Sequence, residues 1–188
     1  MATKTPLQQS VAKSPLGVGV VVVAAAVGLG SIVGCDASRP AAAPTETATV
    51  QRVADGDTLV LRGGSHVRLV QIDAPELGQG ECYGAASKRA HGRLVQTGAH
   101  VALEADLELD QLDRFGRRLR YVYVAGRNVN VELVRLGAAA PYFRHGRRGR
   151  YADLLLEANE EARRKHSGMW AACCVSWSPE RQVETHPR

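Results

Sequence analysis

The chain has 188 residues, a formal net charge of +5 at pH 7 and four cysteines. This length allows one domain of ordinary size with terminal tails, and no repeat or low-complexity tract indicates a second domain. The first 35 residues contain no acidic residue and two basic ones, Lys4 and Lys13, so the remaining chain carries +3. That excess is mild, and by its size alone it indicates solubility rather than a particular partner.

The amino-terminal segment is typical of an exported chain. An apolar run from Leu16 to Val33, interrupted only by glycines and Ser31, is followed by Gly34 and Cys35. This end is similar to a bacterial lipoprotein signal, in which cleavage makes the cysteine the new amino terminus and lipid is attached to it. We therefore expect a signal segment over residues 1–35 and a lipid on Cys35 that anchors the protein in the cell envelope, outside the cytoplasm. The alternatives are an uncleaved transmembrane anchor, for which the run is just long enough, and a soluble secreted product.

The rest of the chain predicts a linker followed by a domain that is mainly β. Residues 36–46 are rich in Pro and Ala and have too little bulky apolar character to fold, which indicates a spacer. Apolar–polar alternation predicts five strands, and apolar i, i+3, i+4 spacing predicts helices. The strands cover 47–53, 58–62, 66–72, 100–109 and 118–124, and the helices cover 83–97, 130–137 with Asn130 as N-cap, and 150–165 with Leu154 and Leu155 facing the core. These elements predict an α+β fold over residues 47–175, a closed five-stranded barrel with about three packed helices. The polar residues 176–188 are expected to form a flexible tail.

Two acidic clusters suggest the chemistry. Asp55-Gly56-Asp57-Thr58 precedes one predicted strand, Asp73-Ala74-Pro75-Glu76 ends another, and Arg68 lies between them. Carboxylates that converge from such turns can hold a hard divalent cation, and Glu76 and Arg117 supply a candidate base and a second guanidinium. This combination suits an enzyme that cuts phosphodiesters. Two arginine clusters suit a polyanionic substrate, namely Arg114, Arg117, Arg118 and Arg120, and Arg144, Arg147, Arg148 and Arg150.

An ordered set of motifs resembles the staphylococcal nuclease (thermonuclease) family over roughly residues 46–172. Besides the two acidic clusters, the set comprises Val67-Arg68-Leu69, Cys82-Tyr83-Gly84-Ala85-Ala86, Asp113-Arg114-Phe115-Gly116-Arg117 and the run from Asn130 to Gly137. A lone acidic turn is weak evidence, whereas the whole ordered set is specific. The resemblance implies an OB-fold, an architecture whose open face often binds oligonucleotides.

The resemblance also implies roles for individual residues. Asp57 and Asp73 would be the side-chain ligands of a calcium ion, and the main-chain carbonyl of Ala74, where the family often has Thr, would be a third ligand. Glu76 would be the general base that activates water, and Arg68 and Arg117 would stabilise the charge on the phosphoryl oxygens. The rival interpretation of each aspartate alone is a turn-capping residue. Asp55 is expected to be a turn residue beside the site.

Further residues match positions that contact substrate in the family. Arg114 would contact phosphate, and Phe115, Tyr142 and Phe143 would lie near the bound nucleotide, with core packing as an equal alternative for the aromatic residues. The segment from Leu77 to Cys82 departs from the family because it is short and lacks lysines.

The proposed site sets one geometric condition. Arg68 and Asp73 are five residues apart, a distance of roughly 16 Å along an ideal strand. They can share a site only where the strand curves or contains a bulge.

The resemblance implies a disulfide between Cys82 and Cys173, which an exported chain permits. Cys174 would remain free or would take the place of Cys173. A zinc site is the weaker interpretation, because no suitably spaced fourth ligand follows.

We therefore expect a monomeric, calcium-dependent nuclease that hydrolyses DNA and RNA and leaves 3′-phosphate ends. The alternatives are a non-catalytic OB-fold module that binds nucleic acid at the envelope, and an envelope interaction protein that uses the barrel as a scaffold. Neither alternative needs Arg68, Glu76 and Arg117 together.

Overall fold

The computed structural model describes residues 45–188. The expected signal segment, Cys35 and nearly all of the linker therefore lie outside the described residues. Within residues 45–188, no helix combines the length and apolar character needed to cross a membrane.

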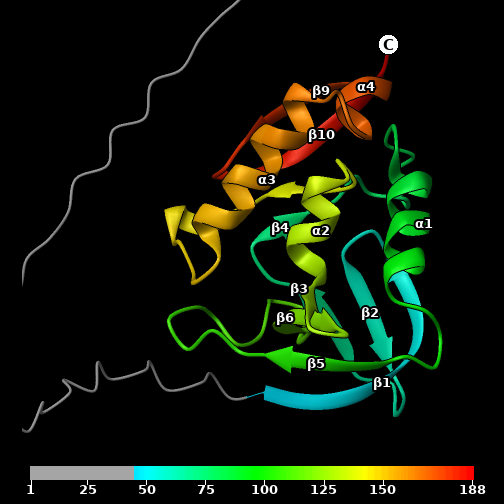
Figure 1. Cartoon of the computed structure of the whole chain (residues 1–188), viewed down its shortest axis with the longest axis vertical. Coiled ribbons are helices and arrows are strands. Elements are labelled where there is room, and N and C mark those ends of the chain that lie inside the picture. The colour runs from blue at the N-terminus through cyan, green and yellow to red at the C-terminus, as the bar shows by residue number, and fades with distance from the viewer. Residues whose placement is uncertain (1–44) are drawn as a thin grey trace, which may run out of the picture. The chain divides into compact units, whose positions relative to one another are not determined.

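Five strands close into a barrel (Figure 1). They are β1 (Thr45–Asp55), β2 (Thr58–Leu61), β3 (His66–Leu69), β5 (His100–Glu104) and β6 (Arg118–Val124). The strands pair in the order β3-β2-β1-β5-β6, and β6 pairs back to β3 in parallel, which closes the sheet. The predicted five-stranded barrel of a mainly β, α+β fold is thus confirmed. The two-residue strand β7 (Arg127–Asn128) extends the sheet beyond β6.

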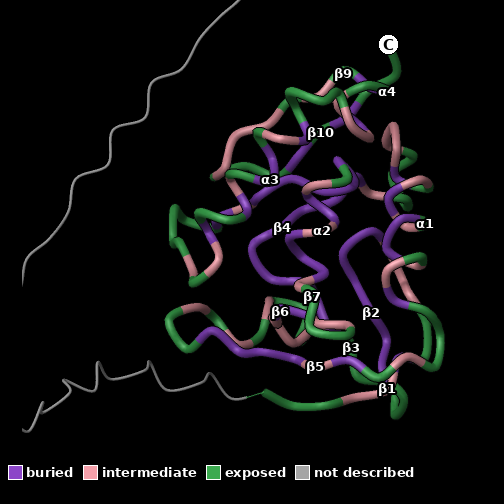
Figure 2. Tube along the Cα trace, in the orientation of Figure 1, coloured by how far each residue is buried: buried purple, intermediate pink, exposed green. Residues whose placement is uncertain are grey.

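The bending of β1 makes closure possible. Its first half, Thr45–Thr49, pairs with β5, and its second half, Val50–Asp55, pairs with β2. The register of the second pairing shifts between Val50 and Arg52 and again between Val53 and Asp55. Such irregularities bend a strand and increase its twist, as a small barrel requires. Figure 2 shows that β2, one of the strands of this barrel, is buried along its whole length.

Three principal helices pack on the barrel, as predicted. They are α1 (Gly84–Leu94), α2 (Val129–Arg135) and α3 (Ala152–Arg164); a single 3-10 turn, η1 (Arg144–Gly146), and the short α4 (Met169–Ala172) flank α3. The core face of α3 carries Leu155, Ala158 and Ala162 as expected, but the prediction for Leu154 is wrong, because its side chain is 48% exposed. Leu154 lies one residue, about 100° around the helix, from Leu155.

The predicted N-cap of α2 is also wrong. The side chain of Asn128, not Asn130, caps the helix by accepting a hydrogen bond from the main-chain N–H of Val131. Asn130 is buried inside the helix, where its side chain donates to the carbonyl of Val70 and accepts from the N–H of Val122. It therefore links α2 to the end of β3 and to β6.

The segment 176–188, expected to be a flexible tail, is ordered. With Cys173–Val175 it forms a hairpin of β9 (Cys173–Ser178) and β10 (Arg181–Pro187). In β10, Val183 and Thr185 are buried, and the residues beside them are exposed, which is the alternation of a half-buried strand. The prediction of a flexible tail relied on the polar composition of this segment and overlooked the alternation of buried and exposed residues.

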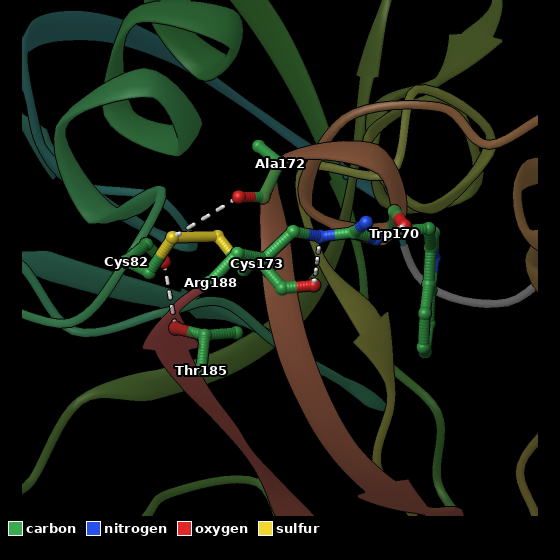
Figure 3. Close-up of a disulfide and its surroundings, with 6 residues drawn as sticks. All are labelled: Cys82, Trp170, Ala172, Cys173, Thr185 and Arg188. Atoms are coloured by element: carbon green, nitrogen blue, oxygen red, sulfur yellow. Dashed lines mark hydrogen bonds between the residues drawn. A yellow bond between two sulfur atoms is a disulfide. The ribbon is translucent and has the colours of Figure 1, made fainter.

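The hairpin packs beside a second small sheet. This sheet pairs β4 (Ile72–Asp73) with β8 (Ala140–Pro141), and the indole N–H of Trp177 donates to the carbonyl of Pro141 at 2.8 Å. The Cys82–Cys173 disulfide joins the start of β9 to the residues before α1, and Thr185 Oγ1 donates to the Cys82 carbonyl at 2.6 Å (Figure 3). Cys174 is free and exposed.

Replacing both disulfide cysteines with serine should destabilise the domain. The bridge spans 91 residues of sequence, and a cross-link over a loop of this size contributes roughly 2–5 kcal/mol. Urea unfolding without reductant should show this loss for Cys82→Ser/Cys173→Ser, whereas Cys174→Ser should unfold like the parent chain. Equal midpoints for the two variants would show that the bridge contributes nothing to stability.

Candidate active site

A buried arginine lies between two buried carboxylates. The guanidinium of Arg68, on β3, donates through Nη2 to Asp73 Oδ1 at 2.6 Å, and its Nη1 forms an ion pair with Asp57 Oδ2. The exposed fractions of the three residues are 8% for Arg68, 4% for Asp57 and 2% for Asp73. Burial lowers the pKa of Arg68, and the charge of Asp73 opposes this shift. The two acidic clusters of the sequence therefore meet at one guanidinium.

The turn between β1 and β2 holds Asp57. Its Oδ1 accepts a hydrogen bond from the Thr58 hydroxyl, and its Oδ2 accepts one from the main-chain N–H of Ala74, both at 3.0 Å. The preceding residue must be Gly56, since a β-carbon there would lie 2.6 Å from that of Ala74 and 2.3 Å from Ser87 Oγ. The first acidic cluster is thus packed directly against the second.

A left-handed residue brings Asp73 back toward Arg68. Between β3 and β4 the chain turns at Gln71, whose φ is +63°, a conformation that is uncommon outside glycine and asparagine. The Gln71 side chain donates to the carbonyl of Arg147 and accepts from the N–H of Gly149, both at 2.7 Å. These bonds hold the turn. Because the chain turns here, Arg68 and Asp73 are not separated by the roughly 16 Å that five residues of an extended strand would span.

Two donors from the hairpin also reach Asp73. The main-chain N–H of Val183 donates to Asp73 Oδ2 at 2.9 Å, and the Gln182 amide donates to Oδ1 at 3.3 Å. Sequence reasoning missed both contacts because it treated this segment as a tail.

Glu76 is half-buried beside the ion pair. Burial raises the pKa of its carboxyl group, the nearby charge of Asp55 raises it further, and the charge of Arg68 opposes the shift. The main-chain N–H of Glu76 donates to Glu81 Oε2 at 2.8 Å, which fixes the start of the loop before α1. Glu76 is therefore close enough to Arg68 and Asp73 to interact with both charges.

Arg117 enters the site from a tight turn. Its Nε donates to Asp113 Oδ2 at 2.5 Å, and its Nη1 lies 3.4 Å from the Thr58 hydroxyl that also contacts Asp57. Asp113 Oδ1 accepts from the main-chain N–H groups of Phe115 and Arg117, both at 2.9 Å. Burial acts in the opposite direction, but these bonds hold the pKa of Asp113 below its usual value. Asp113 belongs to one of the motifs that carry the family resemblance, but its role in orienting Arg117 was not predicted.

Arg68 and Arg117 both line a cleft of about 220 Å³. Its lining includes Arg68, Arg114, Phe115, Arg117, Tyr142, Arg144, Arg147 and Gln182. The Phe115 ring is 67% exposed, and the guanidinium carbons of Arg114 and Arg117 lie 4.7 and 5.3 Å from its centroid. Phe115, Arg114 and Tyr142 are thus placed to meet a ligand.

Phe143 does not line this cleft. Its side chain is 3% exposed and belongs to the main hydrophobic core. The prediction that it contacts nucleotide is wrong, and the alternative of core packing holds. Phe143 follows Tyr142 directly, and adjacent residues of an extended chain point to opposite sides.

The acidic residues fit a sparse cation site. Among residues 45–188 no group of three or more His, Cys, Asp or Glu side chains is arranged to hold a metal. The Asp57 and Asp73 carboxylates, however, point at the same buried positive charge, so their oxygens already converge where a cation is favoured. Two carboxylates, one main-chain carbonyl at Ala74 and water are the oxygen ligands that Ca²⁺ accepts.

Comparison with known proteins identifies related chains. The family model described as "Staphylococcal nuclease homologue" matches residues 66–172. An uncharacterized endonuclease of Haemophilus influenzae is 35% identical over 130 residues, which cover 66% of each chain. A thermonuclease of Staphylococcus intermedius is 33% identical over 132 residues, 66% of this chain and 76% of the relative. A micrococcal nuclease of Shigella flexneri is 36% identical over 135 residues, 65% and 72% of the two chains. The matched region thus spans about two thirds to three quarters of these relatives, whose names support a phosphodiester hydrolase.

Removing the central guanidinium should destabilise the metal-free domain. Arg68→Met would leave two like-charged buried carboxylates without their cation, and uncompensated buried charges cost about 3–5 kcal/mol. Urea unfolding in chelator should show this loss. Arg118→Met is the matched control, because Arg118 pairs with the exposed Glu46, and pairs of that kind contribute about 0–1 kcal/mol. Equal losses in the two variants would contradict the central position of Arg68.

Proposed function

The chain belongs to the staphylococcal nuclease family, and we propose that it is a calcium-dependent nuclease that hydrolyses phosphodiester bonds in DNA and RNA. One observation carries this proposal: Arg68, which pairs with both Asp57 and Asp73 and whose charge acts on Glu76, lines a single basic cleft together with Arg117. A binding module would not require a carboxylate base and two guanidiniums at the same place.

Asp57, Asp73 and the Ala74 carbonyl would hold the divalent cation. When bound, a cation at this position supplies positive charge that polarises a phosphate oxygen and favours attack at phosphorus. Members of the family depend on a metal, and we propose Ca²⁺ because the ligands are few, are all oxygens and leave room for water. Arg68 has to release at least part of its hold on the two carboxylates when the cation binds.

Glu76 takes the proton from the attacking water. Its half-buried carboxyl group has a pKa raised by burial and by Asp55, so the carboxylate is a stronger base than a glutamate in water. The charge of Arg68 opposes this shift. The water oxygen then bonds to phosphorus as Glu76 accepts its proton. The bond from phosphorus to the 5′ oxygen breaks, and the leaving 5′ oxygen takes up a proton from solvent.

The two arginines stabilise the negative charge that develops on the phosphoryl oxygens. Asp113 fixes Arg117 through its Nε and the Thr58 hydroxyl contacts Nη1, so Nη2 remains available for substrate. A preorganised donor of this kind contributes about 10²–10³ in rate. Guanidiniums keep their protons while donating two bonds at once, which suits a phosphate that gains charge in the transition state.

The cleft suits nucleic acid of any sequence. Its arginines would contact phosphates, and the exposed Phe115 ring offers a surface on which any base can stack. This arrangement supports action on both DNA and RNA. Release of 3′-phosphate and 5′-hydroxyl ends is proposed from the family resemblance.

A nuclease assay tests the proposal on a fragment that begins at Pro40, five residues before β1. Cleavage of single-stranded DNA and RNA should require Ca²⁺ and stop in EDTA. Glu76→Gln should lower kcat by about 10²–10⁴-fold, the contribution of general-base catalysis. The control Glu157→Gln, at an exposed position of α3, should retain activity within an order of magnitude.

Two results would reject parts of this mechanism. Activity that is indifferent to chelator would reject the cation assignment, and parental activity in Glu76→Gln would reject the base. Tight nucleic-acid binding without any cleavage would favour the non-catalytic alternative.

We further propose that the protein is exported and anchored to a membrane through a lipid on Cys35. The Cys82–Cys173 disulfide supports export, because disulfides persist mainly in oxidising compartments. Metabolic labelling with a radioactive fatty acid in a bacterial host should label the parent chain, and Cys35→Ser should lose the label. The matched variant Cys174→Ser should keep it, and labelling that survives Cys35→Ser would refute the anchor.

A further inference from the structure

A β-bulge interrupts the carboxy-terminal hairpin beside the proposed cation site. Arg181 pairs with Ser178 and Glu184 pairs with Ser176, so β10 advances three residues while β9 advances two. The extra residue lies among Gln182 and Val183, the residues that contact Asp73. Bulges turn main-chain groups out of the regular ladder and occur frequently next to active sites.

The bulge directs two donors onto the two oxygens of Asp73. The Val183 N–H occupies Oδ2 at 2.9 Å, and the longer bond from Gln182, at 3.3 Å, reaches Oδ1. Oδ1 is also the oxygen that Arg68 contacts. Because Oδ2 accepts from the hairpin, the rotation of the carboxylate is fixed with Oδ1 facing Arg68.

Several contacts hold the hairpin in place, so that it can determine the orientation of the Asp73 carboxylate. The Cys82–Cys173 disulfide holds β9, the Thr185 hydroxyl bonds to the Cys82 carbonyl, and the N–H of Phe143 donates to the Pro179 carbonyl at 2.5 Å. Val183 itself is 3% exposed and packs in an apolar cluster with Ala140, Met169 and Cys173. The position of its N–H is therefore set by the packing of the Val183 side chain and by the pairing of β10 with β9.

We propose that the hairpin β9–β10 is a positioning element of the cation site, in which the Val183 N–H and the Gln182 amide orient Asp73 for metal binding. Both residues lie beyond residue 172, where the match to the family model ends. The inference rests on the proposed function, since it takes Asp73 as a cation ligand. Groups that hold a ligand in place typically contribute about 10–100-fold to metal affinity.

The direct test compares two substitutions at one position. Val183→Pro removes the N–H, whereas Val183→Ala loses a similar amount of packing and keeps the donor. Proline is tolerated at bulges, where the regular ladder is already broken. Isothermal titration of the full chain with CaCl₂ should give a Kd about 10–100-fold weaker for Val183→Pro than for Val183→Ala. Circular dichroism establishes that both variants are folded under the titration conditions.

A second pair keeps the inference testable if Val183→Pro does not fold. Gln182→Ala removes the side-chain donor, and Glu184→Ala changes the next exposed residue on the same strand, so only the first should weaken Ca²⁺ binding, by about threefold to tenfold. Equal Kd values within each pair would overturn the positioning role and leave the proposed function standing. A parent chain that binds no Ca²⁺ would overturn both.

Discussion

The ion pairs of Arg68 with Asp57 and Asp73 are the constraint on which the rest of the structure depends. Burying two like charges is costly unless a positive charge lies between them, and Arg68 provides that charge from the middle of β3. A divalent cation would satisfy the same two carboxylates. The metal-free fold and the proposed metal-bound enzyme therefore use one acidic pair, and Arg68 becomes available to a phosphate to the extent that a cation replaces it.

Several separate structural features bring the residues of the candidate site together. The bend of β1 closes the barrel and places Asp57 beside β3, and the left-handed Gln71 turns Asp73 back to the same point. Asp113 organises the turn that presents Arg117, and the disulfide-linked hairpin reaches Asp73 from the opposite end of the chain. The site is thus assembled from long-range contacts.

Sequence patterns predicted the parts of the molecule that follow local periodicity or an ordered motif. The five barrel strands, the three main helices and the Cys82–Cys173 pair belong to this class. Sequence patterns could not predict the turn at Gln71, because glutamine has no preference for positive φ. The conformation of Gln71 is fixed by its bonds to residues 147 and 149, which are distant in the sequence. The predictions for Phe143 and for the carboxy-terminal hairpin were wrong for a related reason. Motif position and polar composition suggested exposure, whereas the tertiary structure packs Phe143 in the main hydrophobic core and Val183 against Ala140.

The most direct test of the account is a crystal structure of the chain grown with and without Ca²⁺. The account predicts one ion with oxygens of Asp57 and Asp73 at about 2.3–2.6 Å, and a guanidinium of Arg68 that has moved from between the carboxylates toward the cleft. An ion bound elsewhere, or an Arg68 that keeps both ion pairs when Ca²⁺ is bound, would contradict it.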